Sequence, residues 1–350
     1  MNEQDRLARA EVLRQLPKGC LEPRPEETVL FLYLLFAVIF GTLAILFSNL
    51  PLWLNLLIST VLGNCYAGFF FFGHYLGHGS MVKTRWLREA MLFPCFWMLG
   101  MSPHLWKSWH HSMHHKLTNV PGMDPDAFGT IAHQQKRPIP WLFIPGNGRA
   151  IPSLFFLFTF FTGHVQMILW VYSRSKVFCR LSRLNRKRAI VETVSMFASI
   201  CLLGYLSGPL ALFTVLIPWI VANAITVSYT MTQHLLCPAP PKGGTLDSTM
   251  SVRVPEWLDV LHFRNSHHVE HHLFPEAPIK TLPMIRKVLL GMGQFKCPRM
   301  LTALRCVYYT PRFHSVDGQA LIDHKTGRRV THNFIDYVLK NNGPYYYIKP

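Results

Sequence analysis

Long apolar runs divide this chain before any other pattern does. Residues 29–48, 53–72 and 209–229 are each about twenty residues long and contain no charged side chain. An α-helix of this length crosses the roughly 30 Å hydrocarbon core of a bilayer. The pattern predicts an all-α integral membrane protein that crosses the bilayer several times.

Two further apolar stretches, residues 151–172 and 190–207, need a place relative to the bilayer. Positive charge favours the cytoplasmic side, and residues 174–188 contain seven Lys or Arg. If that loop lies inside, residues 190–207 and 209–229 form a second hairpin. We therefore expect four transmembrane helices in two hairpins, with residues 151–172 interfacial or re-entrant and with both termini cytosolic.

The same reasoning divides the chain into seven segments. They are a cytosolic N-terminal segment at 1–28, a first transmembrane hairpin at 29–72, a cytosolic cap portion at 73–150, an interfacial helix and basic loop at 151–189, a second transmembrane hairpin at 190–229, a second cap portion at 230–295 and a cytosolic C-terminal tail at 296–350.

The high positive charge of the chain is consistent with the assigned transmembrane helices. The 350 residues are 50% hydrophobic and 15% charged, with a formal net charge of +17. In a soluble protein such a charge would indicate nucleic acid. Here the basic residues flank the apolar runs, so topology explains them. We expect membrane lipid as a partner and no nucleic acid.

Histidine clustering is the strongest chemical signal. Of the 18 histidines, five lie between residues 104 and 115 and five between 262 and 272. His111-x-x-His114-His115 and His268-x-x-His271-His272 share one spacing, and His74-x-x-x-His78 follows the second apolar run. Residues at i, i+3 and i+4 share one face of a helix, and neutral imidazole is the commonest metal ligand. The three boxes therefore predict a metal site beside the cytosolic ends of the spans.

The number of ligands indicates a dinuclear site. His234, after the last apolar run, supplies a possible ninth nitrogen. Eight or nine nitrogens exceed the coordination of one ion, and imidazole suits iron, zinc or copper. Asp124 and Asp126 either bond to the outer nitrogens of ligand rings or lie in a solvated turn. The expected metal ligands are His74, His78, His111, His114, His115, His234, His268, His271 and His272.

Two other interpretations of the histidines stay open. His267-x-x-Glu270-His271 matches the H-x-x-E-H motif of zinc membrane proteases, in which the glutamate acts as a base on a zinc-bound water. That scheme leaves the other boxes without a role. A metal transporter would also gather imidazoles, but transport favours ionisable residues at the bilayer midplane, whereas the boxes lie outside the apolar runs.

The boxes also carry a resemblance. His74-Tyr75-Leu76-Gly77-His78, then His111 to His115 with Asp124-Pro125-Asp126, then His268-Val269-Glu270-His271-His272-Leu273-Phe274-Pro275 occur in that order. With them, residues 29–290 resemble the membrane fatty acid desaturase superfamily of histidine-box desaturases and hydroxylases. The resemblance implies a four-helix stalk beneath a cytosolic helical cap that holds two non-haem iron ions, with His234 as the family's additional ligand. Some members have an Asn four residues before that histidine, where this chain has Thr230.

The resemblance further implies the reaction and its partners. Breaking an unactivated C–H bond needs metal-activated O2, because no side chain can do it. The expected reaction is desaturation of a fatty acid or fatty acyl chain. Decarboxylation of a fatty acid to a terminal alkene and hydroxylation are the alternatives, since only fine positioning separates them. The sequence carries no haem-domain or dinucleotide-binding motif, so we expect a separate electron donor such as ferredoxin or cytochrome b5 with its reductase.

Overall fold

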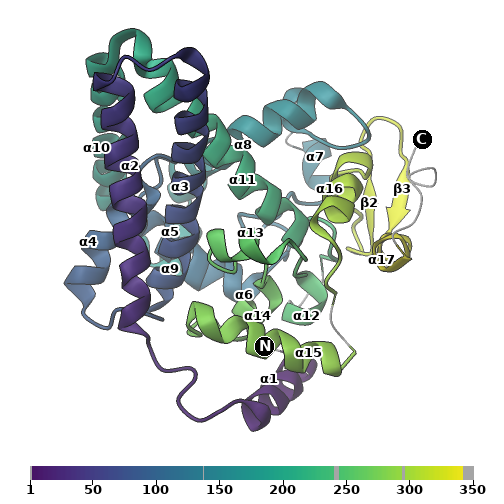
Figure 1. Ribbon diagram of the computed structural model, residues 1–350. Helices are drawn as coiled ribbons and strands as arrows, with labels where there is room; N and C mark the ends of the chain where they lie inside the picture. Colours follow the sequence, from purple (N-terminus) through teal and green to yellow (C-terminus); the bar gives the residue numbers. More distant parts are fainter. Residues whose placement is uncertain (1, 137, 240–243, 294–295, 342–350) are drawn as a thin grey trace.

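The computed structural model describes residues 2–136, 138–239, 244–293 and 296–341, and the described chain is mostly helical (Figure 1). Its helices are α1 (Glu3–Gln15), α2 (Val29–Phe47), α3 (Leu52–His78), α4 (Arg85–Phe96), α5 (Pro103–Trp109), α6 (His115–Leu117), α7 (Ile131–Lys136), α8 (Ala150–Trp170), α9 (Lys176–Ser182), α10 (Arg186–Ser207), α11 (Ile217–His234), α12 (Thr245–Ser248), α13 (Glu256–Leu261), α14 (His268–Leu273), α15 (Leu282–Gly291), α16 (Met300–Tyr309) and α17 (His332–Asn341). Its strands are β1 (Phe313–His314), β2 (Ala320–Ile322) and β3 (Arg329–Thr331). Short 3₁₀ turns occupy Pro25–Thr28, Trp141–Phe143, Tyr172–Arg174, Gly208–Leu210 and Ile279–Thr281, and π turns occupy His110–His114 and Leu212–Leu216.

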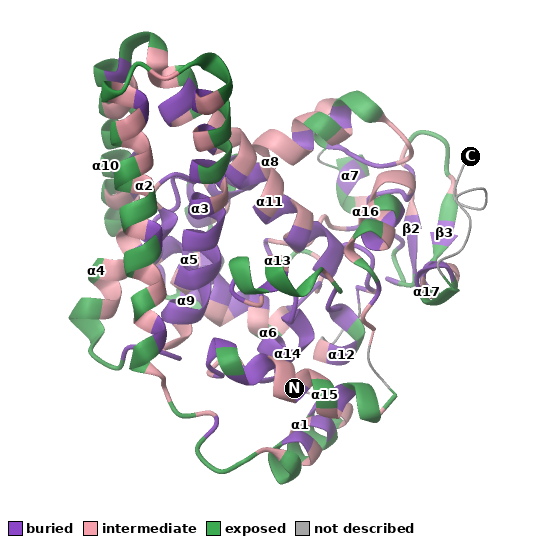
Figure 2. Ribbon diagram, in the orientation of Figure 1, coloured by how far each residue is buried: buried purple, intermediate pink, exposed green. Residues whose placement is uncertain are grey.

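Five of the described helical segments are long and apolar enough to cross a membrane: Pro25–Phe47, Leu52–His78, Ala150–Arg174, Arg186–Leu210 and Leu212–His234. Only 17% of the apolar window is buried within the protein in the segments of α2 and α10, against 67% in that of α3. Figure 2 shows the same contrast, with exposed residues along α2 and α10 and buried residues along the lower part of α3. These helices fit the multi-pass membrane protein expected, with α3 as its central element.

The packing of α3 depends on small residues where other elements approach closely. α3 packs most extensively against α11, and also against α2 and α4. A Cβ added at Gly63 would lie 2.5 Å from the Cβ of Val221 on α11, and one added at Gly77 would overlap the ring of Trp106 on α5. Small residues allow such close helix packing in membranes. The lower end of α3, which carries His74 and His78, is thereby fixed against its neighbours.

Helix α8 lies against α11 but is oriented differently from the other long helices. In Figure 1 it runs across the direction of α2 and α10 rather than along it. The side chain of Asn223 on α11 accepts the N–H of Thr162 at 3.1 Å and donates to the Thr162 hydroxyl at 3.2 Å. A buried polar contact of this kind fixes the position of α8 on α11.

The N-terminal segment is an ordered part of the fold. Asp5 is 1% exposed, and its carboxylate accepts the N–H groups of Thr245 and Leu246 at the start of α12 at 2.9 and 3.2 Å. Arg9 donates to the carbonyl of Leu273 and lies over the ring of Phe274. Helix α1 therefore supports the segment that contains the third histidine box.

The C-terminal segment contains the one small sheet of the described chain, which the all-α expectation did not include. The strands pair antiparallel in the order β1-β2-β3, with Phe313 opposite Ile322 and Leu321 opposite Val330. Gly318, with φ of 69°, helps to reverse the chain between β1 and β2. The N–H of His314 also bonds to the carbonyl of Gly129 at 3.0 Å, so this segment packs against the loop before α7. Residues 342–350 of the expected tail lie outside the described residues.

Candidate metal centre

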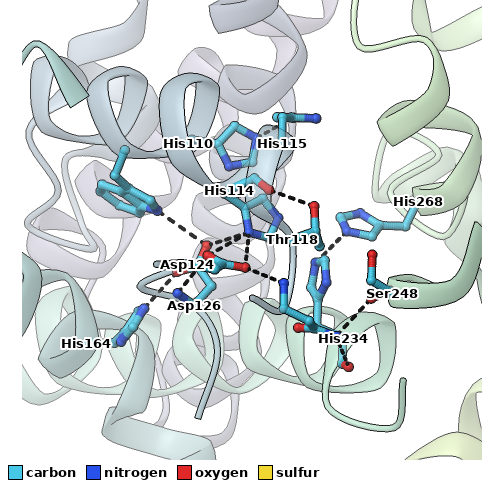
Figure 3. A network of polar contacts seen from close by, with 12 residues as sticks. His110, His114, His115, Thr118, Asp124, Asp126, His164, His234, Ser248 and His268 are labelled. Carbon is cyan, nitrogen blue, oxygen red and sulfur yellow. Dashed lines mark hydrogen bonds and ion pairs between the residues drawn. The ribbon is translucent and has the colours of Figure 1, made fainter. Parts of the chain in front are cut away.

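Four separate parts of the chain meet at the histidines. The end of α3 contributes His74 and His78, the turn after α5 contributes residues 110–115, the end of α11 contributes His234, and α14 contributes residues 268–272. Figure 3 shows His110, His114 and His115 from the second box beside His234 and His268. The histidine nitrogens fall into two groups, and within each group the possible ligand atoms lie within 4.8 Å of one another. A third set of the same size, His110, His114 and Asp126, joins one ring of each group to a carboxylate.

The first histidine group comprises His74, His78, His110, His115 and His271. The Nε2 atom of His74 lies 2.7 Å from that of His271 and 3.0 Å from that of His110. The Nε2 atom of His115 lies within 3.2 Å of three other Nε2 atoms, those of His78, His110 and His271. A ring nitrogen carries either one proton or one lone pair, so these contacts cannot all be hydrogen bonds. A cation that accepts the converging lone pairs satisfies them together.

The second histidine group comprises His114, His234, His268 and His272, and all four side chains are buried. The Nε2 atoms of His234 and His268 lie 2.6 Å apart. Both ring nitrogens of His272 are buried and have no hydrogen-bond partner, which is costly unless another group binds them. The donor set of each group therefore fits a metal ion.

Eight of the nine expected ligands belong to these groups, and His111 does not. Its ring centroid lies 4.2 Å from that of His78, and its Nε2 atom is buried without a partner. His110, which the sequence interpretation left out, occupies the first group instead. The cause is the π turn at His110–His114, which has more residues per turn than an α-helix and brings i and i+5 together. The spacing His110-x-x-x-His114-His115 was the available signal.

Burial keeps most of these rings neutral, which is the form that binds metal. Desolvation holds the pKa values well below the ordinary histidine range for His110, His115, His268, His271 and His272. His114 is the exception. Burial would lower its pKa, but the carboxylates of Asp124 and Asp126 outweigh that effect and raise the pKa to about 8.

The carboxylate of Asp124 accepts a hydrogen bond from the outer nitrogen of His114, and Asp126 forms an ion pair with the same nitrogen, as one of the two sequence interpretations expected. Asp124 is 3% exposed, so it is not a solvated turn residue. The Nδ1 atom of His114 lies 3.1 Å from Asp124 and 3.2 Å from Asp126. Such outer carboxylates fix the orientation and tautomer of a metal-bound ring. The free nitrogen, Nε2, is then directed to the second group.

Glu270 is engaged in a way that does not suit a zinc protease. It is fully buried, and it accepts the hydroxyl of Ser251 at 2.5 Å and the Nε–H of Arg286 at 2.5 Å. A catalytic base has to reach a metal-bound water. The carboxylate of Glu270 instead links the third box to Arg286 on α15.

A cavity adjoins both groups. Its volume is about 50 Å³, so it is smaller than the usual ligand pocket of about 300–1,000 Å³. Apolar walls come from Phe70, Phe160, Phe161 and Met231, and the rings of both groups form another side. Thr230 also lines it, so the position where some family members carry Asn faces the same space. The apolar side chains of the cavity therefore lie opposite the histidines.

Comparisons with known proteins agree with this geometry. The model of the family described as fatty acid desaturase matches residues 51–303. An sn-1 oleoyl-lipid 12-desaturase of Synechocystis sp. is 27% identical over 293 residues, covering 78% of each chain. A Delta(8)-fatty-acid desaturase of Helianthus annuus is 25% identical over 70% of this chain and 57% of its own length. An sn-1 oleoyl-lipid 12-desaturase of Anabaena variabilis is 24% identical over 78% of this chain and 79% of its own.

Proposed function

The chain belongs to the fatty acid desaturase family and is an oxidoreductase, and from this premise we propose that it uses O2 and two histidine-bound iron ions to desaturate a fatty acyl chain. The observation that carries the proposal is the convergence of imidazole nitrogens in two adjacent groups. Such nitrogens cannot satisfy one another by hydrogen bonds, and two ions account for both groups.

The ligands proposed are the nine expected from the sequence, with His110 added. His110 is better positioned than His111 in the first group, because its Nε2 atom lies 3.0 Å from those of both His74 and His115. His111 stays a predicted ligand. Substitution of each residue separates the two possibilities, as described in the Discussion.

Iron supplies the activation of O2 that hydrogen abstraction from an alkyl carbon requires. The protein supplies the position of the substrate: Phe70, Phe160, Phe161 and Met231 exclude water and hold the acyl chain beside the histidines. The overall reaction converts one CH2–CH2 unit, O2, two electrons and two protons into a CH=CH unit and two waters. The electrons come from a separate carrier such as ferredoxin or cytochrome b5.

We further propose four membrane crossings with the metal centre and both termini in the cytosol. The Nε2 atoms of His115 and His271 lie 3.2 Å apart, so an even number of crossings separates the second and third boxes. Three candidate helices lie between those boxes, namely α8, α10 and α11. Because α10 and α11 can form a hairpin, α8 is the helix that does not cross. This topology is tested by introducing single cysteines at residues 174–188 and treating intact cells with a thiol reagent that does not cross membranes. Labelling of these cysteines from outside the cell would contradict the proposed topology.

Product analysis tests the reaction. Purified protein, loaded with iron and supplied with O2 and a reducing system, is incubated separately with free fatty acids, acyl thioesters and acyl lipids. We expect an internal alkene, detected by mass spectrometry, and no product from the matched variant His271→Ala. A terminal alkene one carbon shorter than the substrate would show that the reaction is decarboxylation. An alcohol would show that it is hydroxylation. Equimolar zinc with no iron-dependent product would contradict the proposal.

A further inference from the structure

His164 lies at the metal centre although it belongs to none of the histidine boxes. It is on α8, 7% exposed, and its Nε2 atom lies 2.8 Å from Oδ1 of Asp126. Its ring stacks on Phe160, with centroids 4.9 Å apart. Figure 3 shows His164 on the far side of Asp126 from His114. In the described chain, α8 contributes no ring to either histidine group. His164 instead connects α8 to the histidines through the carboxylate of Asp126.

The two carboxylates beside His114 are held in different ways. Asp124 accepts two backbone N–H groups, from Asn119 at 2.9 Å and from residue 126 at 3.0 Å. Its orientation is therefore fixed by its own loop. The carboxylate of Asp126, apart from its contact with His114, is held in the described structure by two side chains, His164 and Trp109, and the Trp109 bond is the longer one at 3.3 Å. The orientation of Asp126 thus depends mainly on His164.

This dependence reaches mainly one of the two groups. Among the rings of both groups, in the part of the chain described, His114 alone bonds to a carboxylate. His114 belongs to the second group. If Asp126 loses His164, a carboxylate that is only 15% exposed is left without its closest partner, which is costly. It must then rotate or change its contact with His114. His110 of the first group also lies within 4.8 Å of Asp126 and His114, but its hydrogen-bond contacts are with His74 and His115, so we expect the larger effect in the second group.

We propose that His164 is a positioning residue for the second histidine group: it holds Asp126, and Asp126 holds the ring of His114 in its ligand orientation. The inference rests on the two-ion function proposed above. Loss of an outer partner of this kind lowers metal affinity by about 10- to 100-fold. We expect the lower end, about tenfold, because Asp124 still holds His114.

Two substitutions separate the hydrogen bond from the packing. His164→Phe keeps a ring against Phe160 but removes the donor, whereas His164→Gln keeps an N–H near the position of Nε2. Iron content is measured while a competing chelator is increased. We expect His164→Phe to release one of two irons at about tenfold lower chelator concentration, and His164→Gln to behave like the wild type. The control is His262→Gln, since His262 is also buried but bonds to Tyr229 and Asn64.

A double variant identifies which iron is released. In a His234→Ala background the iron of the second group is already weak, so adding His164→Phe should cause no further loss. Where His164→Phe does not fold, as judged by thermal unfolding, Asp126→Asn takes its place and must give the same selective release. The inference would be overturned if folded His164→Phe retained both irons or lost both equally. It would also be overturned if His164→Gln lost iron to the same extent as His164→Phe, or if His164→Phe caused additional loss in the His234→Ala background. Fewer than two irons in the wild type would contradict the proposed function instead.

Discussion

The two histidine groups are built from the same residue type but are held in place differently. In the first group, His78 and His115 are partly exposed, and the rings contact mainly one another and the aromatic ring of Trp106. In the second group all rings are buried, and His114 is tied to two carboxylates. The rings of the first group are therefore held mainly by packing, whereas one ring of the second group, His114, is also held by carboxylates. Substitutions outside the rings should affect the two groups unequally.

Removal of one ring from either group gives the largest effect. We expect His271→Ala and His234→Ala each to lower product formation by more than about 100-fold, because each removes a direct ligand rather than an outer partner. The loss of activity is measured as the rate of alkene formation, with the product quantified by mass spectrometry. His133→Ala, at an exposed histidine, is the control and should retain activity. Full activity in either ligand variant would show that its group is dispensable.

Asp124→Asn should discriminate between the groups. The amide leaves the volume unchanged but removes the charge that orients His114. We expect the affinity for one iron to fall by about 10- to 100-fold while the other iron is retained. Iron content against chelator concentration measures this, with the exposed Asp317→Asn as the matched control. Equal weakening of both irons would remove the distinction drawn here.

His110 and His111 provide a test of the first group. We expect His110→Gln to weaken one iron by at least about tenfold, because the Nε2 atom of His110 lies among the other nitrogens. His111→Gln should have the smaller effect, since His111 lies outside the 4.8 Å group. The two variants are compared in the same iron titration. The reverse order would restore the ligand set that the sequence spacing alone predicts.

Trp109→Phe should have the smallest effect. It removes the 3.3 Å bond from the indole N–H to Asp126 and leaves the bond from His164. The bond is long, and it reaches His114 only through Asp126, which keeps its shorter bond to His164, so we expect the affinity for the second-group iron to fall only a few fold. A loss as large as that from Asp124→Asn would mean that the indole, rather than Asp124, orients His114.

Much of this arrangement could be predicted from the sequence, because it depends on local patterns. Uninterrupted apolar runs indicated spans, and the spacing of His114, His268, His271 and His272 indicated a shared site. The place of His110 in the first group was harder to predict, because it depends on a π turn; the spacing His110-x-x-x-His114-His115 was the one local sign of it.

Features that depend on tertiary placement were also missed. His164 is near Asp126 only because α8 crosses α11, and nothing around residue 164 in the sequence indicates that contact. The strands β1 to β3 have two or three residues each, too few to give an alternating pattern. Conversely, α8 has the length and composition of a transmembrane helix, and the proximity of the second and third boxes is the argument against a crossing.

The most direct test of the central claim is an experimental structure of the iron-loaded protein with anomalous scattering measured at the iron absorption edge. The account predicts two iron peaks, one within ligand distance of His271 and the other within ligand distance of His268. A single peak, or two peaks that belong to zinc, would contradict it.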